Sequence, residues 1–491
     1  LPLAWKPWWR LRQFKGGAQR LLPCSSPCPV SPQYSRCILV AFVLATLSLA
    51  VVLLNLFCFP VFGSNRLGEG KAAPSLDNTC SDPCSIVLVE SIPQDMTYDD
   101  NSTANPSIFQ AWMDLIGDAR SSLDIVAFYW TLTNEDTHTQ DPSAGQGEQI
   151  LEELLKLPMS GVSVRIAVNP PSAKQPLSDL QALEQSGESV APSTGVSSTR
   201  IPDQEQPVLC AGRDGTSPLL WLQVKELGAV VYNCSCLAQD LGKMFEAYWV
   251  LGVPDASIPS PWPANFSTTF NSETPLELKL NGTDAGVYLS SAPPALCADG
   301  RTKDLQALLS VIDGARKFVY VAVMSYIPTM EFSHPKRYWP AIDDHLRKVA
   351  YERRVHVRLL IGCWKHSKPS MFPFLRSLAA MQDNRTHYSL EVRLFVVPAN
   401  ETQAKIPFAR VNHNKYMVTD KLAYIGTSNW SGDYFVHTAG SALVVNQTGP
   451  EAGGAPTLRE QLQAVFERDW DSRYSRDVSS LGQGRDLCGV H

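Results

Sequence analysis

The sequence has few charged residues for its length, and its first 36 residues contain no acidic residue. Of 491 residues only 18% are charged, 44% are hydrophobic, and the net charge is −6. Residues 1–36 contain six lysines and arginines and no acid, which leaves −12 for the rest of the chain. This excludes a broadly basic nucleic-acid-binding surface at neutral pH, although not a local cationic slot. The hydrophobic content excludes a disordered protein, and the length predicts two domains or a duplicated one.

Long hydrophobic runs are also scarce, and the exception is residues 37–59, which are 23 residues without a charge. That length spans a bilayer and exceeds the apolar region of a secretory signal. The basic residues precede it, so the amino terminus is expected in the cytosol. We therefore predict a cytosolic tail (1–36), a single transmembrane signal anchor (37–59) and a lumenal stalk (60–84), with the remainder of the chain lumenal.

Two features agree with a lumenal compartment. Eight Asn-x-Ser/Thr sequons follow the anchor, at Asn101, Asn233, Asn265, Asn281, Asn384, Asn400, Asn429 and Asn446. Eight of the 12 cysteines also follow it, which favours disulfide bonds in an oxidising space. The closely spaced pairs Cys80/Cys84 and Cys234/Cys236 leave metal ligation open as an alternative.

The chain contains an internal repeat. Residues 110–120 (QAWMDLIGDAR) match residues 306–316 (QALLSVIDGAR), and an apolar run of β-forming residues follows each of them. These runs, residues 123–130 and 318–326, are continuously apolar, as expected for strands buried on both faces of a sheet. A second amphipathic helix and a second strand come next in both places. This alternation predicts an α/β fold made of two homologous halves packed together.

One motif indicates chemistry, the sequence H-x-K-x4-D at His413, Lys415 and Asp420, followed by G-T-S-N ending at Asn429. The residues before Asp420 alternate as in a strand, which puts His413 and Lys415 on one face, where both can meet one phosphate. The imidazole can act as nucleophile or acid, the lysine supplies charge, and the Asn429 amide can donate a hydrogen bond. Asp420 lies roughly 23 Å from His413 in an extended chain, so we expect it to shape the turn.

This combination resembles the phospholipase D superfamily, whose motif residues correspond to His413, Lys415 and Asp420, with the trailing asparagine at Asn429. The resemblance implies two phospholipase D-like α/β halves related by a pseudo-two-fold axis, at residues 85–290 and 291–480, with a tail at 481–491. The stretches VESIPQ (89–94), FYWTLT (128–133), QVKELG (223–228) and FSHP (332–335) are similar to the lysosomal, membrane-anchored branch.

For function, the resemblance implies a 5'-3' exonuclease that acts on single-stranded DNA and RNA with a free 5' end and limits nucleic-acid sensing. Hydrolysis passes through a phosphohistidine, without a metal or other cofactor. The implied location is the endoplasmic reticulum, Golgi, endosome and lysosome, where a soluble form is released.

The same resemblance assigns further residues. It implies the disulfides Cys80–Cys236, Cys84–Cys234 and Cys363–Cys488. It also makes Glu226 the carboxylate that orients the histidine of the first half, with an ordinary strand-edge charge as the alternative. Four aromatic residues at strand ends are candidates for base stacking, although a core position is the more frequent role of such residues. They are Tyr129, Trp130, Tyr326 and Trp430.

The family has one motif in each half, and the first is missing here. No histidine occurs between His138 and His334, and residues 192–222 contain no lysine and have the composition of a loop. An altered exon or gene model, a catalytically inactive relative with a binding or trafficking role, and a homodimer that shares histidines remain open, as does a phospholipid phosphodiesterase. Because paired catalytic groups act as a unit, we predict that this chain is close to inactive.

Overall fold

The computed structural model describes residues 79–480, apart from gaps at 128–129, 131, 138–139, 169–177, 192–207, 211–222, 254–255, 384, 386, 448 and 450–453, together with Cys488. Within this part of the chain, no helix is both long and apolar enough to cross a membrane. The predicted tail and anchor, like residues 60–78 of the predicted stalk, lie outside the described residues.

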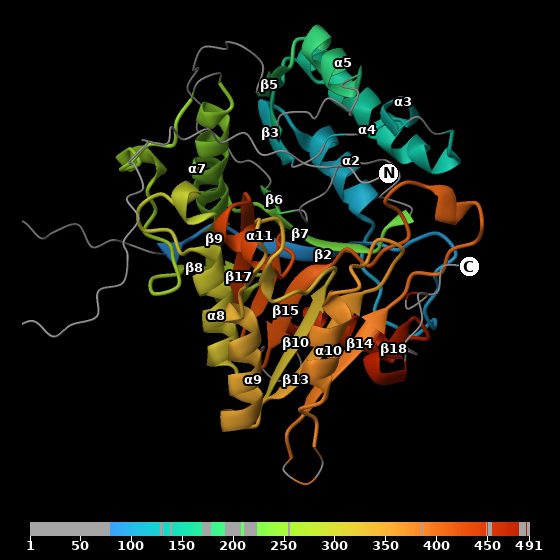
Figure 1. Ribbon diagram of the computed structural model, residues 1–491. Helices are drawn as coiled ribbons and strands as arrows, with labels where there is room; N and C mark the ends of the chain where they lie inside the picture. Colours follow the sequence, from blue (N-terminus) through green and yellow to red (C-terminus); the bar gives the residue numbers. More distant parts are fainter. Residues whose placement is uncertain are drawn as a thin grey trace, which may run out of the picture. The chain divides into compact units, whose positions relative to one another are not determined.

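A ten-stranded mixed sheet forms the centre of the fold (Figure 1). In spatial order its strands are β1 (Thr79–Cys80), β8 (Leu276–Leu280), β9 (Thr283–Ala292), β17 (Gly440–Gln447), β16 (Ala423–Gly426), β15 (Lys415–Thr419), β10 (Phe318–Val323), β13 (His356–Gly362), β14 (Leu390–Phe395) and β18 (Ser475–Asp477). β10, β13 and β14 are parallel, whereas the strands from β8 to β15 pair antiparallel. The apolar run predicted as a strand at 318–326 thus forms a buried central strand over its first part, Phe318–Val323.

Helices cover both faces of this sheet. α8 (Asp304–Gly314), α9 (Ala341–Arg353) and α10 (Met371–Ala379) lie over one face and share a hydrophobic core with it (Figure 1). α12 (Leu458–Asp471) packs on the other face, and a Thr457–Glu460 capping box fixes where this helix begins.

Residues 85–251 form two smaller sheets. The first has the order β2 (Ser85–Ser91), β7 (Glu226–Tyr232), β6 (Val208–Cys210) and is antiparallel. The second has the order β3 (Ser122–Ala127), β4 (Ser163–Val168), β5 (Ser189–Ala191) and is parallel. The helices of this region are α2 (Ile108–Asp118), α3 (Asn134–Thr137), α4 (Gly145–Lys156), α5 (Ser178–Ser186) and α7 (Ser235–Leu251).

One hydrophobic core joins the β2–β7 pair to the ten-stranded sheet. Leu88 and Ala229 from the small sheet belong to the same buried cluster as Phe466 of α12 and Tyr416 of β15. Two predicted boundaries need adjustment. The division between residues 290 and 291 falls inside β9, and the end of the predicted stalk contributes β1 to the sheet.

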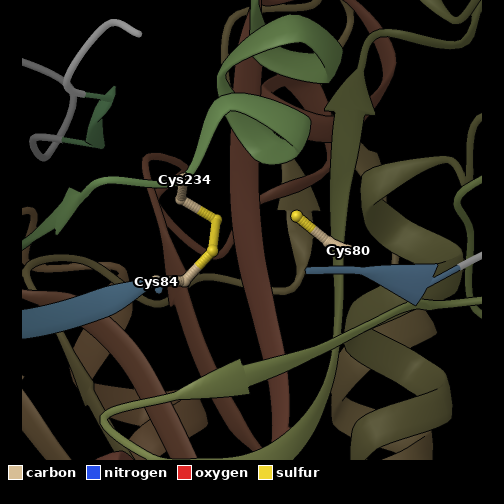
Figure 2. A group of neighbouring side chains, drawn as sticks. All are labelled: Cys80, Cys84 and Cys234. Carbon is tan, nitrogen blue, oxygen red and sulfur yellow. A yellow bond between two sulfur atoms is a disulfide. The ribbon is translucent and has the colours of Figure 1, made fainter. Parts of the chain in front are cut away.

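Three disulfides are present, Cys80–Cys236, Cys84–Cys234 and Cys363–Cys488, so the expected pairing is confirmed. The first two lie next to each other and tie the start of the fold to the start of α7, as Figure 2 shows for Cys84–Cys234 beside Cys80. The sulfur atoms of Cys80, Cys84 and Cys234 are close enough to share a metal ion. All three are oxidised in disulfides, so they are not the thiolates that a metal site needs.

Candidate active site

His413 lies just before β15, one of the two middle strands of the ten-stranded sheet. The strand itself begins at Lys415 and pairs with β10 on one side and β16 on the other. Both side chains are buried. The predicted strand is therefore present, although it begins two residues after His413, and the histidine and lysine lie together as the spacing predicts.

The imidazole of His413 has a carboxylate and an ammonium group as neighbours. Glu226 bonds to Nδ1, and Lys415 Nζ lies 3.0 Å from Nδ1 and 2.9 Å from Nε2. Lys415 also donates to the His413 carbonyl oxygen at 2.6 Å. A carboxylate on Nδ1 favours the tautomer protonated there, which leaves the lone pair of Nε2 for an incoming group. The arrangement suits nucleophilic attack on phosphorus beside a fixed positive charge.

Glu226 was expected to orient the missing histidine of the first half, and here the structure differs. The carboxylate of Glu226, at the start of β7, bonds instead to His413 before β15. The reason lies in the backbone, because residues 223–225 run alongside residues 410–413. Lys225 N–H donates to the Val411 carbonyl at 2.9 Å, and His413 N–H donates to the Lys225 carbonyl at 2.8 Å. These two bonds place Glu226 beside the imidazole.

A buried ionic cluster fixes this backbone junction. The Lys225 side chain is fully buried, and its Nζ lies 2.9 Å from Glu90 Oε1 and 3.0 Å from Asp469 Oδ2. Arg468 completes the cluster by contacting both acids, at 2.7 and 2.9 Å. Burial alone raises the pKa of Glu90, but Lys225 and Arg468 outweigh it and lower that pKa to about 2. Nothing in the sequence pattern pairs these four residues, which lie up to 379 positions apart in the chain.

Several buried amides surround the motif. Asn429 follows β16, and its Nδ2 lies 4.0 Å from the sulfur of Met324. Among the described residues, neither its Oδ1 nor the side chain of Asn414 has a hydrogen-bond partner. Buried polar atoms are normally paired, so those near His413 favour a polar ligand at this place.

Comparison with known proteins identifies the family. The model of the PLD-like domain of PLD3 and PLD4 matches residues 99–400. The chain belongs to this family. The 5'-3' exonuclease PLD3 of Xenopus tropicalis is 55% identical over 93% of each chain, and the 5'-3' exonuclease PLD4 of Mus musculus is 45% identical over 80% of each. The solved phosphatidylserine synthase of Haemophilus influenzae aligns with a TM-score of 0.46 at 12% identity, covering 76% of this chain and 87% of that one.

Asp420, the third residue of the family motif, lies at the opposite end of β15 from His413. Its carboxylate accepts hydrogen bonds from the backbone N–H groups of Arg316 and Lys317, at 2.8 and 2.9 Å. Partial burial raises the pKa of Asp420, but these donors outweigh it and lower that pKa. Such contacts are those of a residue that shapes a turn, and its catalytic assignment stays a prediction.

The aromatic candidates for base stacking are core residues. Trp130, Tyr326 and Trp430 are buried, whereas Tyr129 lies outside the described residues. Trp430 and Tyr326 pack with their ring centroids 6.4 Å apart, and the Tyr326 hydroxyl donates to Asp343 at 2.6 Å. These three residues therefore have the core position that is the more frequent role of such aromatic residues.

The sequons divide by exposure. Six have an exposed asparagine, namely Asn101, Asn233, Asn265, Asn281, Asn400 and Asn446. Asn384 lies outside the described residues, and Asn429 is buried. Glycosylation at the exposed sites stays a prediction, and the buried position of Asn429 argues against its modification in the folded chain.

Proposed function

We propose that this chain is a 5'-3' exonuclease for single-stranded DNA and RNA that works through a phosphohistidine at His413. The observation that carries the proposal is the buried His413, with Glu226 on Nδ1 and Lys415 at the ring. It occurs in a chain 55% identical to proteins named 5'-3' exonuclease PLD3. The substrate is therefore a single strand with a free 5' end.

Each group has a defined task. Nε2 of His413 forms a bond to phosphorus while the ester P–O bond breaks, and water then hydrolyses the P–N bond. Glu226 holds the ring and stabilises the positive charge that the imidazole gains. Lys415 and the Asn429 amide contact the phosphoryl oxygens. The reaction needs no metal in this scheme, because the lysine and the imidazolium neutralise the phosphate.

We further infer that the chain consists of two homologous halves. The orders β2-β7-β6 and β3-β4-β5, with the same pair directions, match β9-β17-β16 and β10-β13-β14 of the large sheet. In the second half β15 joins these two groups and His413 lies at its beginning. No described strand joins β6 to β3. The expected place of such a strand, before β6, falls in residues 192–207, outside the described part.

The absence of the first motif from the sequence bears on the reaction rate. The leaving oxygen needs a proton donor, and in the family the histidine of the other half supplies it. With one motif, we expect turnover far below that of a two-motif relative. A second candidate function follows, in which the chain binds single strands at His413 and releases little product.

The location belongs to the same proposal. We place residues 37–59 across the membrane, with residues 1–36 in the cytosol and the folded part in the lumen of the endoplasmic reticulum, Golgi, endosome and lysosome. Three disulfides and six exposed sequons support an oxidising, glycosylating compartment.

The test uses the detergent-solubilised full chain at pH 5 with EDTA and a single-stranded oligonucleotide labelled at its 3' end. A ladder shortened from the 5' end is expected, at a rate far below that of Xenopus tropicalis PLD3. His413→Ala should abolish it. The control His345→Ala should leave the ladder unchanged. His345 lies on α9, and its imidazole pairs with Asp313 of α8. Binding without shortening would support the second candidate, and neither binding nor shortening would refute both.

A further inference from the structure

Unlike the buried candidates above, two aromatic rings in the segment next to the Asn429 turn are exposed. Phe332 and Tyr338 are 54% and 64% exposed, although neither side chain is polar enough to favour that position. They belong to the segment that includes the short strands β11 (Thr329–Met330) and β12 (Arg337–Tyr338). Each ring is held by a neighbour, Phe332 by Tyr434 at 5.6 Å between centroids and Tyr338 by Phe374 at 6.3 Å.

Cations surround these rings. Segments 331–339 and 364–376 together contain five lysines and arginines and one glutamate, in a chain whose net charge is −6. Lys336, Arg337 and Lys368 are exposed. Lys368 Nζ lies 5.2 Å from the Phe332 ring centroid and pairs with Glu331, which joins the two segments. This is the local cationic surface that the overall charge does not exclude.

Hydrogen bonds connect this surface to the candidate active site. The Ser431 hydroxyl donates to Glu331 at 3.2 Å, and Ser431 is two residues from Asn429. The Phe332 N–H donates to Asp433 of α11 (Gly432–Val436) at 2.9 Å. The segment that presents the rings is therefore bound to the turn that presents Asn429.

A third exposed ring contacts the same cationic segment. Phe408 is 68% exposed and lies five residues before that histidine. Its ring packs on His366, with centroids 5.6 Å apart, and His366 belongs to the same segment as Lys368. Exposed rings thus contact the segment 364–368 at two positions, Phe332 at Lys368 and Phe408 at His366.

We propose that Phe332, Tyr338 and Phe408, with Lys336, Arg337 and Lys368, bind the part of a single strand that follows the nucleotide held at His413. The rings stack on successive bases and the cations contact the phosphates, a combination that binds single strands with little sequence preference. The inference rests on the proposed function, since it takes a single strand as the occupant. Charge complementarity favours this occupant over an apolar protein surface.

The test measures fluorescence anisotropy with the full chain, using an oligonucleotide and an abasic strand with the same number of phosphates. Phe332→Ala should weaken binding of the oligonucleotide about 5-fold or more and leave the abasic strand unchanged, because only the former stacks. Phe332→Trp should bind the oligonucleotide about as tightly as the wild type, because its ring can also stack. Tyr351→Ala is the matched control, since Tyr351 is 59% exposed on α9 and packs on Tyr388.

The cations have a separate signature. The double variant Lys336→Gln/Arg337→Gln should weaken both strands and flatten the dependence of affinity on salt concentration. Equal effects of Phe332→Ala and Tyr351→Ala, or an equal loss for both strands in Phe332→Ala, would overturn the proposal. Stacking-dependent binding without release of nucleotides would support the binding surface and refute the proposed exonuclease function. Release of nucleotides with the same affinity in all variants would support the exonuclease function and refute the binding surface.

Discussion

Lys225→Met tests whether the buried ionic cluster stabilises the junction of residues 223–225 with residues 410–413 at the candidate active site. The methionine keeps most of the length of the side chain but removes the charged group, which lies 2.9 and 3.0 Å from two acids. Breaking a buried ion pair by removing one partner costs about 3–5 kcal/mol, because the other partner stays buried without compensation. Arg468 still contacts both Glu90 and Asp469, so we expect about 3 kcal/mol.

The assay is urea unfolding of the full chain followed by tryptophan fluorescence. Lys279→Met is the matched control, because Lys279 pairs with Asp284 at 2.6 Å with both side chains largely exposed. It should change the free energy of unfolding by no more than about 0.5 kcal/mol. Adding Glu90→Gln to Lys225→Met should recover part of the loss, since the buried negative charge is then gone. Equal effects of the two lysine variants would refute the role given to the cluster.

Two further predictions concern stability. Gly300→Ala should lower the free energy of unfolding by about 2 kcal/mol or more, because Gly300 has φ +84° and a Cβ there would lie 1.9 Å from the Thr268 carbonyl oxygen. Gly282 has φ +79°, but no atom lies within 4 Å of the place where its Cβ would be. If Gly282→Ala lowered the free energy of unfolding as much as Gly300→Ala, the steric argument would be contradicted. Glu90 has a lowered pKa of about 2, so its stabilisation is present above about pH 4.5 and is lost as pH falls toward 2. The difference in unfolding free energy between the wild type and Glu90→Gln should therefore be constant from pH 7 to 5 and narrow below that, and a difference that already shrinks by pH 5 would contradict this pKa.

The sequence by itself determined the α/β fold class and predicted which residues form the candidate site. The apolar run at 318–326 is typical of a strand that is covered on both faces, and β10 forms from its first part. The spacing of His413 and Lys415 brings them together without reference to the rest of the chain. The disulfides followed from family resemblance, since the eight cysteines after residue 59 alone allow many pairings.

Only the tertiary structure decided what surrounds the histidine. Glu226 meets His413 because two backbone segments almost 190 residues apart run side by side, and no local pattern encodes that pairing. The ion pair of Lys225 with Glu90 likewise joins residues that no local pattern connects. The exposure of Phe332 also depends on the tertiary structure, because from sequence alone a phenylalanine is expected in the core. Local periodicity specifies which face of an element is apolar, whereas contacts between distant segments depend on how the elements pack.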